Sequence, residues 1–137
     1  MRKTVAAVFA AATLLSLSVA ADARPRMAPE EKLAKLLDGR VAGEPQDCIY
    51  LPSIHGSQII DRTAIVYDAG RTLWVNRPRT GAESLDDTTI LVTDIHGSGS
   101  QLCSIDIVRL HDQSTFFYSG FVGLGEFVPY RKVAAAN

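Results

Sequence analysis

This sequence of 137 residues is poor in cysteine, tryptophan and histidine, and it has no excess of either charge. Its 14 Lys and Arg against 15 Asp and Glu give a net charge of −1, whereas nucleic-acid binding proteins show a strong basic excess. Neither the Gly-x-Gly-x-x-Gly pattern of dinucleotide sites nor the Gly-x-Ser-x-Gly pattern of hydrolases occurs. These absences predict a protein that binds no nucleic acid, carries no cofactor and has no catalytic residues.

The N-terminal residues 1–23 have the pattern of a secretory signal peptide. A positively charged start is followed by the mainly apolar residues 5–17 and by small-residue cleavage sites that end at Ala20 and Ala23. The apolar run is shorter than the roughly 20 residues of a membrane-spanning helix, and no later segment approaches that length. We predict cleavage after Ala23 rather than after Ala20. An uncleaved membrane anchor is the alternative.

The mature chain is then expected to begin at Arg24 and to work in the periplasm or as a secreted protein. It would have 114 residues, which suits one domain, and its 12 basic and 14 acidic residues would give a net charge of about −2. Residues 24–28 are basic and interrupted by proline, which predicts a flexible leader. Residues 29–137 are predicted to form a single mainly β domain with no membrane span.

Cys48 and Cys103 are the only cysteines, and the predicted signal peptide sends both to an oxidising compartment. An even number of cysteines in a small exported domain indicates a disulfide, which here closes a loop of 55 residues. The chain-entropy model assigns such a bond about 4 kcal/mol, a large share of the net stability of a small domain. Two free buried thiols are the alternative.

Residues 29–38 predict the one helix of the domain. A proline followed by two acidic residues suits the first helical turn, and Leu33, Leu36 and Leu37 form an apolar stripe. Gly39 suits the end of the helix. Because an isolated helix of this length is unstable in water, its leucine face must pack against another part of the protein.

From residue 40 onward the pattern is that of β-strands. The strongest hairpin signal is Asp68-Ala69-Gly70, because glycine suits the left-handed position of a three-residue turn. About seven strands are predicted, at residues 48–51, 58–60, 63–67, 71–76, 88–93, 105–110 and, taken together, 116–118 with 126–130. Short strands at close spacing behind one N-terminal helix predict a mainly β fold, a small antiparallel sandwich or barrel.

Two similar turns suggest a metal site. His55 and His96 each precede Gly-Ser at the end of a strand, and either Asp94 or Asp61 would complete a set of imidazole and carboxylate ligands suited to zinc or copper. The spacing does not enforce this arrangement. Solvent-exposed turn histidines are the alternative interpretation.

A group of arginines around one tryptophan suggests a binding patch. Arg71, Arg77 and Arg79 lie around a predicted strand that carries Trp74, and these residue types recognise anionic or sugar ligands. The alternative places Trp74 in the core and the arginines along a solvated sheet edge.

The last third of the chain concentrates aromatic residues: Phe116, Phe117, Tyr118, Phe121, Phe127 and Tyr130. Large aromatic side chains usually fill cores, so we interpret this region as packing. A stacking surface for a glycan is the alternative.

Several segments share a pattern with known proteins: Cys48-Ile49, Ser57-Gln58-Ile59-Ile60-Asp61, Thr63-Ala64-Ile65-Val66-Tyr67, Val75-Asn76-Arg77-Pro78, Leu85-Asp86-Asp87, Gln101-Leu102-Cys103, Val108-Arg109-Leu110, Gly120-Phe121-Val122 and Phe127-Val128-Pro129-Tyr130. The chain, from about residue 33 to residue 131, resembles a family of short exported proteins of Gram-negative bacteria whose function is unknown. The resemblance implies residence in the cell envelope and one domain that contains both cysteines. It implies no activity and no catalytic or binding residues.

The sequence as a whole predicts a non-enzymatic binding or interaction protein of the bacterial cell envelope, held together by one disulfide. Its partner would be an envelope protein or a glycan, with the patch of Arg71, Trp74, Arg77 and Arg79 as the first candidate surface. The alternative is a metal-binding or metal-dependent envelope protein that uses His55 and His96.

Overall fold

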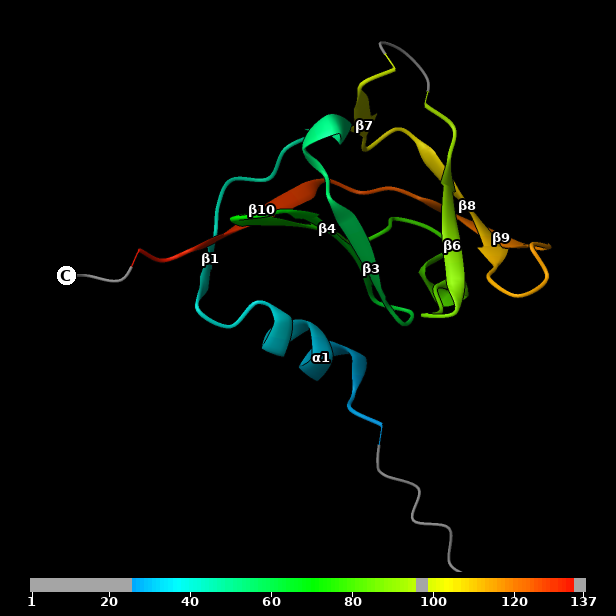
Figure 1. The fold of residues 1–137 in the computed structure, drawn as a ribbon, viewed down its shortest axis with the longest axis horizontal. Coiled ribbons are helices and arrows are strands. Elements are labelled where there is room, and N and C mark those ends of the chain that lie inside the picture. The colour runs from blue at the N-terminus through cyan, green and yellow to red at the C-terminus, as the bar shows by residue number, and fades with distance from the viewer. Residues whose placement is uncertain (1–25, 96–98, 135–137) are drawn as a thin grey trace, which may run out of the picture.

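The structure is a computed structural model that describes residues 26–95 and 99–134. The predicted signal peptide, residues 1–23, lies outside the described residues. Helix α1 (Pro29–Leu36) packs on one face of a five-stranded sheet (Figure 1). Two smaller sheets pack against the other face of the five-stranded sheet. No described helix is long and apolar enough to cross a membrane.

All strands of the large sheet are antiparallel to their neighbours, in the order β1-β10-β5-β4-β3. Their bounds are β1 (Arg40–Ala42), β10 (Phe127–Lys132), β5 (Thr72–Asn76), β4 (Ala64–Ala69) and β3 (Gly56–Ile60). β4 and β5 form the hairpin that the sequence predicts. Gly70 has a φ of +76°, and its N–H donates to the Asp68 carboxylate over 2.7 Å, as the turn chemistry requires.

The second layer consists of two smaller sheets. β2 (Cys48–Tyr50) pairs with β7 (Gln101–Cys103), and β8 (Ile107–Asp112) lies between β6 (Thr89–Thr93) and β9 (Tyr118–Gly123). The connections hold two short 3₁₀ helices, η1 (Leu51–Ser53) and η2 (Ala82–Ser84). β3 and β6 are sheet edges that line opposite sides of a cleft of about 310 Å³, so the described sheets form a sandwich-like fold rather than a closed barrel.

Strand alternation sends the side chains of the large sheet into two separate cores. In the larger core, Ile65 and Tyr67 of β4 meet Val108 and Leu110 of β8 and Leu102 of β7. The smaller core lies under the helix and is formed by the following buried residues: Leu33, Ile60, Ala64, Val66, Leu73 and Val75. The leucine face of the helix therefore packs against the sheet, which satisfies the requirement stated for so short a helix.

The predicted fold class is confirmed, since residues 26–95 and 99–134 are mainly β with one α-helix. The described chain has ten strands rather than about seven. The prediction missed β1 and β7, which have three residues each and show little alternation. It also took residues 116–118 and 126–130 together as one strand, where the structure has two separate strands, β9 and β10. The helix ends at Leu36 rather than at residue 38, and Gly39, with a φ of +69°, lies in the turn that leads into β1.

Candidate functional site

Four aromatic side chains are exposed on one hairpin, the connection between β8 and β9 together with β9 itself. The exposed fractions are 69% for Phe116, 75% for Phe117, 57% for Tyr118 and 48% for Phe121. We call these four residues the aromatic hairpin; it lies at the opposite end of the molecule from β1 (Figure 1). The interpretation of the C-terminal aromatic residues as packing is therefore wrong for these four and right for Phe127, which is fully buried.

The register of β8 and β9 explains the exposure of the two rings on the strand. Leu110 of β8 points into the larger core, so its neighbours Arg109 and His111 point outward. Phe121 lies directly opposite Arg109, and Tyr118 lies opposite His111, with the two ring centroids 6.0 Å apart in an edge-on arrangement. Because the register shifts between Leu110 and His111, the two aromatic rings, although three positions apart in β9, share the outer face of the three-stranded sheet.

Hydrogen bonds fix the turn that carries Phe116 and Phe117. The Asp112 carboxylate accepts bonds from the N–H groups of Ser114 and Thr115, over 2.9 and 2.7 Å. These bonds hold the pKa of Asp112 below its ordinary value, with the Thr115 N–H as the largest cause. Phe116 has a φ of +59°, a left-handed conformation that costs energy for a residue with a side chain, and its N–H donates to the Asp112 carbonyl. Hydrogen bonds within the turn therefore hold its backbone in one conformation.

A cleft of about 440 Å³ lies beside β9, between that strand and η2. Tyr118 and Phe121 line it from the strand. Thr80, Glu83 and Ser84 line it from residues 80–84, which contain η2 and are called the η2 segment below. We call it the β9 cleft. Two backbone hydrogen bonds hold its walls together, from the Arg79 N–H to the Gly123 carbonyl and from the Gly123 N–H to the Thr80 carbonyl.

Gly81 allows the two walls to come this close. Its φ is +78°, and a Cβ at this position would lie 2.2 Å from the carbonyl oxygen of Phe121. Any side chain would therefore force the η2 segment away from β9. The shape of the β9 cleft is built into the backbone.

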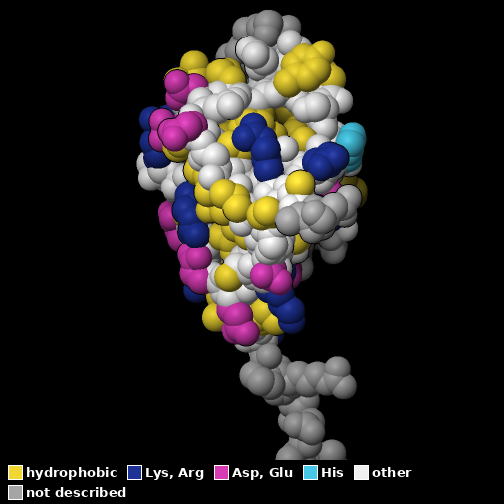
Figure 2. Space-filling view, turned by 90° about the vertical axis from the view of Figure 1, so that its left-hand side faces the viewer, with side chains coloured by type: hydrophobic (Ala, Val, Ile, Leu, Met, Phe, Trp, Pro, Cys, Tyr) yellow, Lys and Arg dark blue, Asp and Glu magenta, His cyan; other side chains and the backbone are white. Residues whose placement is uncertain are grey.

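Arg71, the first residue of the predicted binding patch, lies at the other end of the molecule. Arg40 donates to the Arg71 carbonyl over 2.9 Å, and Arg40 lies opposite Lys132 in the sheet. Figure 2 shows the face at this end of the molecule, where Lys and Arg side chains lie among hydrophobic ones. Charges interspersed with apolar groups are ordinary for a protein surface.

Trp74 of β5 and Arg77, which directly follows that strand, both take part in packing. Trp74 is half-buried against the larger core, as the alternative interpretation stated. Arg77 makes a two-pronged ion pair with Glu30 of the helix, over 2.7 and 2.9 Å. These bonds hold the pKa of Glu30 below its ordinary value. Arg77 thereby ties the helix to the end of β5.

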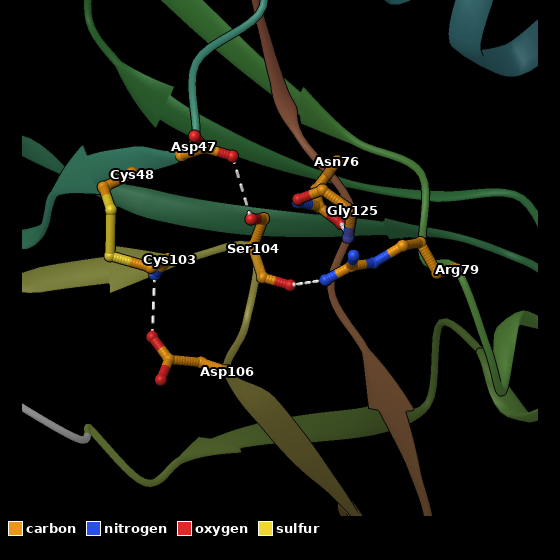
Figure 3. The surroundings of a disulfide bond; sticks show 8 residues. All are labelled: Asp47, Cys48, Asn76, Arg79, Cys103, Ser104, Asp106 and Gly125. Carbon is orange, nitrogen blue, oxygen red and sulfur yellow. Dashed lines mark hydrogen bonds between the residues drawn. A yellow bond between two sulfur atoms is a disulfide. The ribbon is translucent and has the colours of Figure 1, made fainter.

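Arg79 lies near the disulfide and bonds to backbone carbonyls (Figure 3). Its Nε–H donates to Leu124 over 2.9 Å, and a second guanidinium N–H donates to Ser104. Arg71, Trp74, Arg77 and Arg79 thus do not form one surface in this structure. Their role in ligand binding stays a prediction.

The predicted disulfide between Cys48 and Cys103 is present and joins directly opposed residues of β2 and β7. Its surroundings are rich in hydrogen bonds (Figure 3). The Cys103 N–H donates to the Asp106 carboxylate over 2.7 Å. Asn76 is fully buried and exchanges two bonds with Gly125, donating to its carbonyl over 2.7 Å and accepting from its N–H over 3.1 Å.

The metal hypothesis depends partly on His96, which lies outside the described residues. His55 is exposed, Asp61 accepts a backbone hydrogen bond from Asp87, and Asp94 pairs with an arginine. In the described part of the chain, no three His, Cys, Asp or Glu side chains gather in a way that could hold a metal ion. A site that includes His96 stays a prediction.

One signal in the sequence points to the aromatic hairpin. Phe116, Phe117 and Tyr118 are consecutive, and consecutive strand residues point to opposite sides, so all three cannot face one core. Comparison with known proteins adds no further information on the site, because no family model, curated protein or solved structure matches this chain. The resemblance to exported Gram-negative proteins therefore stays a prediction.

Proposed function

We propose that this protein is an exported, non-enzymatic binding protein of the bacterial cell envelope, which works in the periplasm or after secretion. The signal-peptide pattern of residues 1–23 supports export. The bond between Cys48 and Cys103 supports an oxidising compartment, because structural disulfides persist there and are rare in the cytosol.

The observation that carries the binding function is the exposure of the aromatic hairpin. Contiguous exposed apolar patches on soluble proteins mark interaction sites. Ile107 of β8, which is about half exposed on the same outer face, extends the patch beyond the four aromatic residues. Aromatic side chains bury a large area with few rotatable bonds, which makes them strong contributors to binding energy.

The order of the turn supports the same function. Binding costs conformational freedom wherever a loop must be immobilised, and the cost is lower for a loop that is already fixed. Asp112 fixes the turn through its bonds to Ser114 and Thr115, and Phe116 is held in a strained conformation. Strain of this kind persists only where a structure is over-determined, and it concentrates at functional sites.

Co-sedimentation with cell envelopes tests the proposal. The mature protein is mixed with washed envelope fragments of a Gram-negative bacterium, and the bound fraction is measured against protein concentration. We expect the double variant Phe116→Ser with Phe117→Ser to bind at least about tenfold more weakly, since two interface aromatics each contribute more than 1 kcal/mol at typical hot spots.

A matched control carries Val41→Ser with Tyr50→Ser, two side chains of similar exposure (61% and 56%) outside the hairpin. This variant should bind envelopes like the wild type, and thermal unfolding should show that both variants are folded. Equal binding by the hairpin variant and the wild type contradicts the proposal, and so does failure of the wild type to bind.

A further inference from the structure

We propose that the β9 cleft is a saccharide-binding site, and that the envelope component held by this protein is a glycan of neutral or cationic sugars. This inference rests on the proposed function and specifies its ligand class. It depends on the chemistry of the residues that line the cleft: Thr80, Glu83, Ser84, Tyr118 and Phe121.

The aromatic wall of the cleft suits the apolar faces of sugar rings. Tyr118 and Phe121 project from the same strand and retain about half of their surface in contact with water. A sugar ring has faces of C–H groups, which pack on flat apolar surfaces, and a rim of hydroxyl groups that must keep hydrogen bonds. Tyr118 offers both an apolar ring and a hydroxyl group at its tip.

The opposite wall supplies the hydrogen-bonding groups that the hydroxyl rim requires. Thr80 and Ser84 carry hydroxyl groups that both donate and accept, and the Glu83 carboxylate accepts strong O–H···O bonds. None of these three side chains has a hydrogen bond or an ion pair to another residue in the described part of the chain. Their polar atoms are therefore open to a ligand.

The charge of the cleft restricts the sugar. Glu83 is the one charged side chain among the described residues that line it, and Lys and Arg are not among them. A phosphorylated or uronic sugar would bring a second negative charge close to this carboxylate, which is unfavourable. Neutral hexoses, acetamido sugars and amino sugars have no such penalty.

The size and stiffness of the cleft fit a short stretch of glycan. Its volume of about 440 Å³ lies in the range of small-ligand sites, in which apolar walls surround a few placed polar groups. The backbone bonds between the η2 segment and β9 hold the walls in place without a ligand. A saccharide therefore needs to order little of the protein when it binds.

Titration calorimetry with defined oligosaccharides tests this site. The probes are chitotriose triacetate and cellotriose as neutral sugars, and trigalacturonate as an anionic one of the same length. We expect at least one neutral probe to bind and the anionic probe to bind at least about tenfold more weakly. Tyr118→Ala and Phe121→Ala should each weaken neutral-sugar binding by about tenfold, since the loss of one stacking ring typically exceeds 1 kcal/mol.

Two further variants separate the site from its surroundings. Glu83→Gln should reduce the preference for neutral over anionic sugars, because it removes the repulsion and keeps the size of the side chain. Tyr50→Ser, which removes a ring of similar exposure outside the aromatic hairpin and the cleft lining, should leave the affinity for trisaccharides within about twofold. Thermal unfolding of each variant shows that any loss of binding occurs in a folded protein.

The outcomes distinguish this inference from the proposed function. If envelopes bind through the aromatic hairpin but no neutral trisaccharide binds, the saccharide site is wrong, while the binding function stands. If trisaccharides bind equally well to the Tyr118 and Phe121 variants, the β9 cleft is not the site. If cell-wall sacculi stripped of protein retain the full binding of intact envelopes, the glycan assignment is supported.

Discussion

Around the disulfide, polar side chains bond to the protein's own backbone, whereas in the aromatic hairpin apolar side chains point outward into water. Arg79 and Asn76 use their hydrogen-bonding groups on the backbone carbonyls and N–H groups of neighbouring loops. Phe116 and Phe117, in contrast, bury little of their apolar surface against the protein, since more than two thirds of each residue is exposed.

The difference shows which side chains of a small protein keep hydrogen-bonding groups or apolar surface that the fold itself does not use. A residue type suited to ligands, such as arginine, has fewer donors left for a ligand when backbone carbonyls already accept some of them. A residue type suited to cores becomes a binding group when no layer of the fold covers it. The two regions therefore predict opposite responses to substitution: loss of stability at the disulfide and loss of binding at the hairpin.

The largest expected effect on stability comes from the disulfide itself. Replacing both Cys48 and Cys103 by serine releases a loop of 55 residues in the unfolded chain. The free energy of unfolding should fall by about 4 kcal/mol, as urea denaturation of wild type and variant would measure. A fall of less than about 1 kcal/mol would show that the neighbouring hydrogen bonds, not the covalent bond, hold this region.

The next largest effect is expected at Asn76. Asn76→Ala leaves the buried N–H and carbonyl of Gly125 without their partners, which should cost about 1–3 kcal/mol in urea denaturation. Tyr67→Phe is the matched control in the larger core, because the buried Tyr67 hydroxyl has no hydrogen-bond partner among the described residues. Its removal should leave stability unchanged or slightly raised. Equal losses in the two variants would contradict the account of the network.

The smallest effect is expected in the turn of the aromatic hairpin, and it depends on pH. The bonds to Asp112 lower its pKa below the ordinary 3.8, so they stabilise the turn above that pH and are lost as the pH falls through the lower, folded-state pKa. Amide-exchange protection of Ser114 and Thr115 should therefore be present at about pH 5 and reduced at about pH 2. Protection of the β4–β5 hairpin serves as the internal reference.

Asp112→Ala should remove the protection of these two amides at both pH values without a measurable change in global unfolding. It should also weaken envelope binding less than the double Phe116 and Phe117 variant does, because the rings remain and only their placement is loosened. Unchanged protection in Asp112→Ala would mean that other contacts order the turn.

Features that depend on neighbouring residues could be predicted from the sequence. The β4–β5 hairpin follows from Asp68 and Gly70, whose turn chemistry is local. The disulfide follows from having two cysteines and a predicted signal peptide, without any knowledge of strand order. The helix follows from the spacing of its leucines, although it ends at Leu36, two residues before the predicted end.

Features that depend on distant residues could not be predicted in the same way. Arg77 meets Glu30, 47 positions earlier in the chain, and nothing in the local sequence of either residue indicates the pair. Arg79 meets carbonyl groups of two other loops. Trp74 packs partly against the larger core, and the strand pattern alone leaves open both this placement and an exposed one in a binding patch.

The sequence by itself determined the mainly β fold, the single helix and the covalent link between Cys48 and Cys103, because alternation, turn residues and cysteine number act over short distances or through composition alone. Only the tertiary structure decided which residues have surface left for a partner. Exposure is set by how layers stack: the one helix covers the large sheet, and the outer face of β8 and β9 keeps Tyr118 and Phe121 in contact with water.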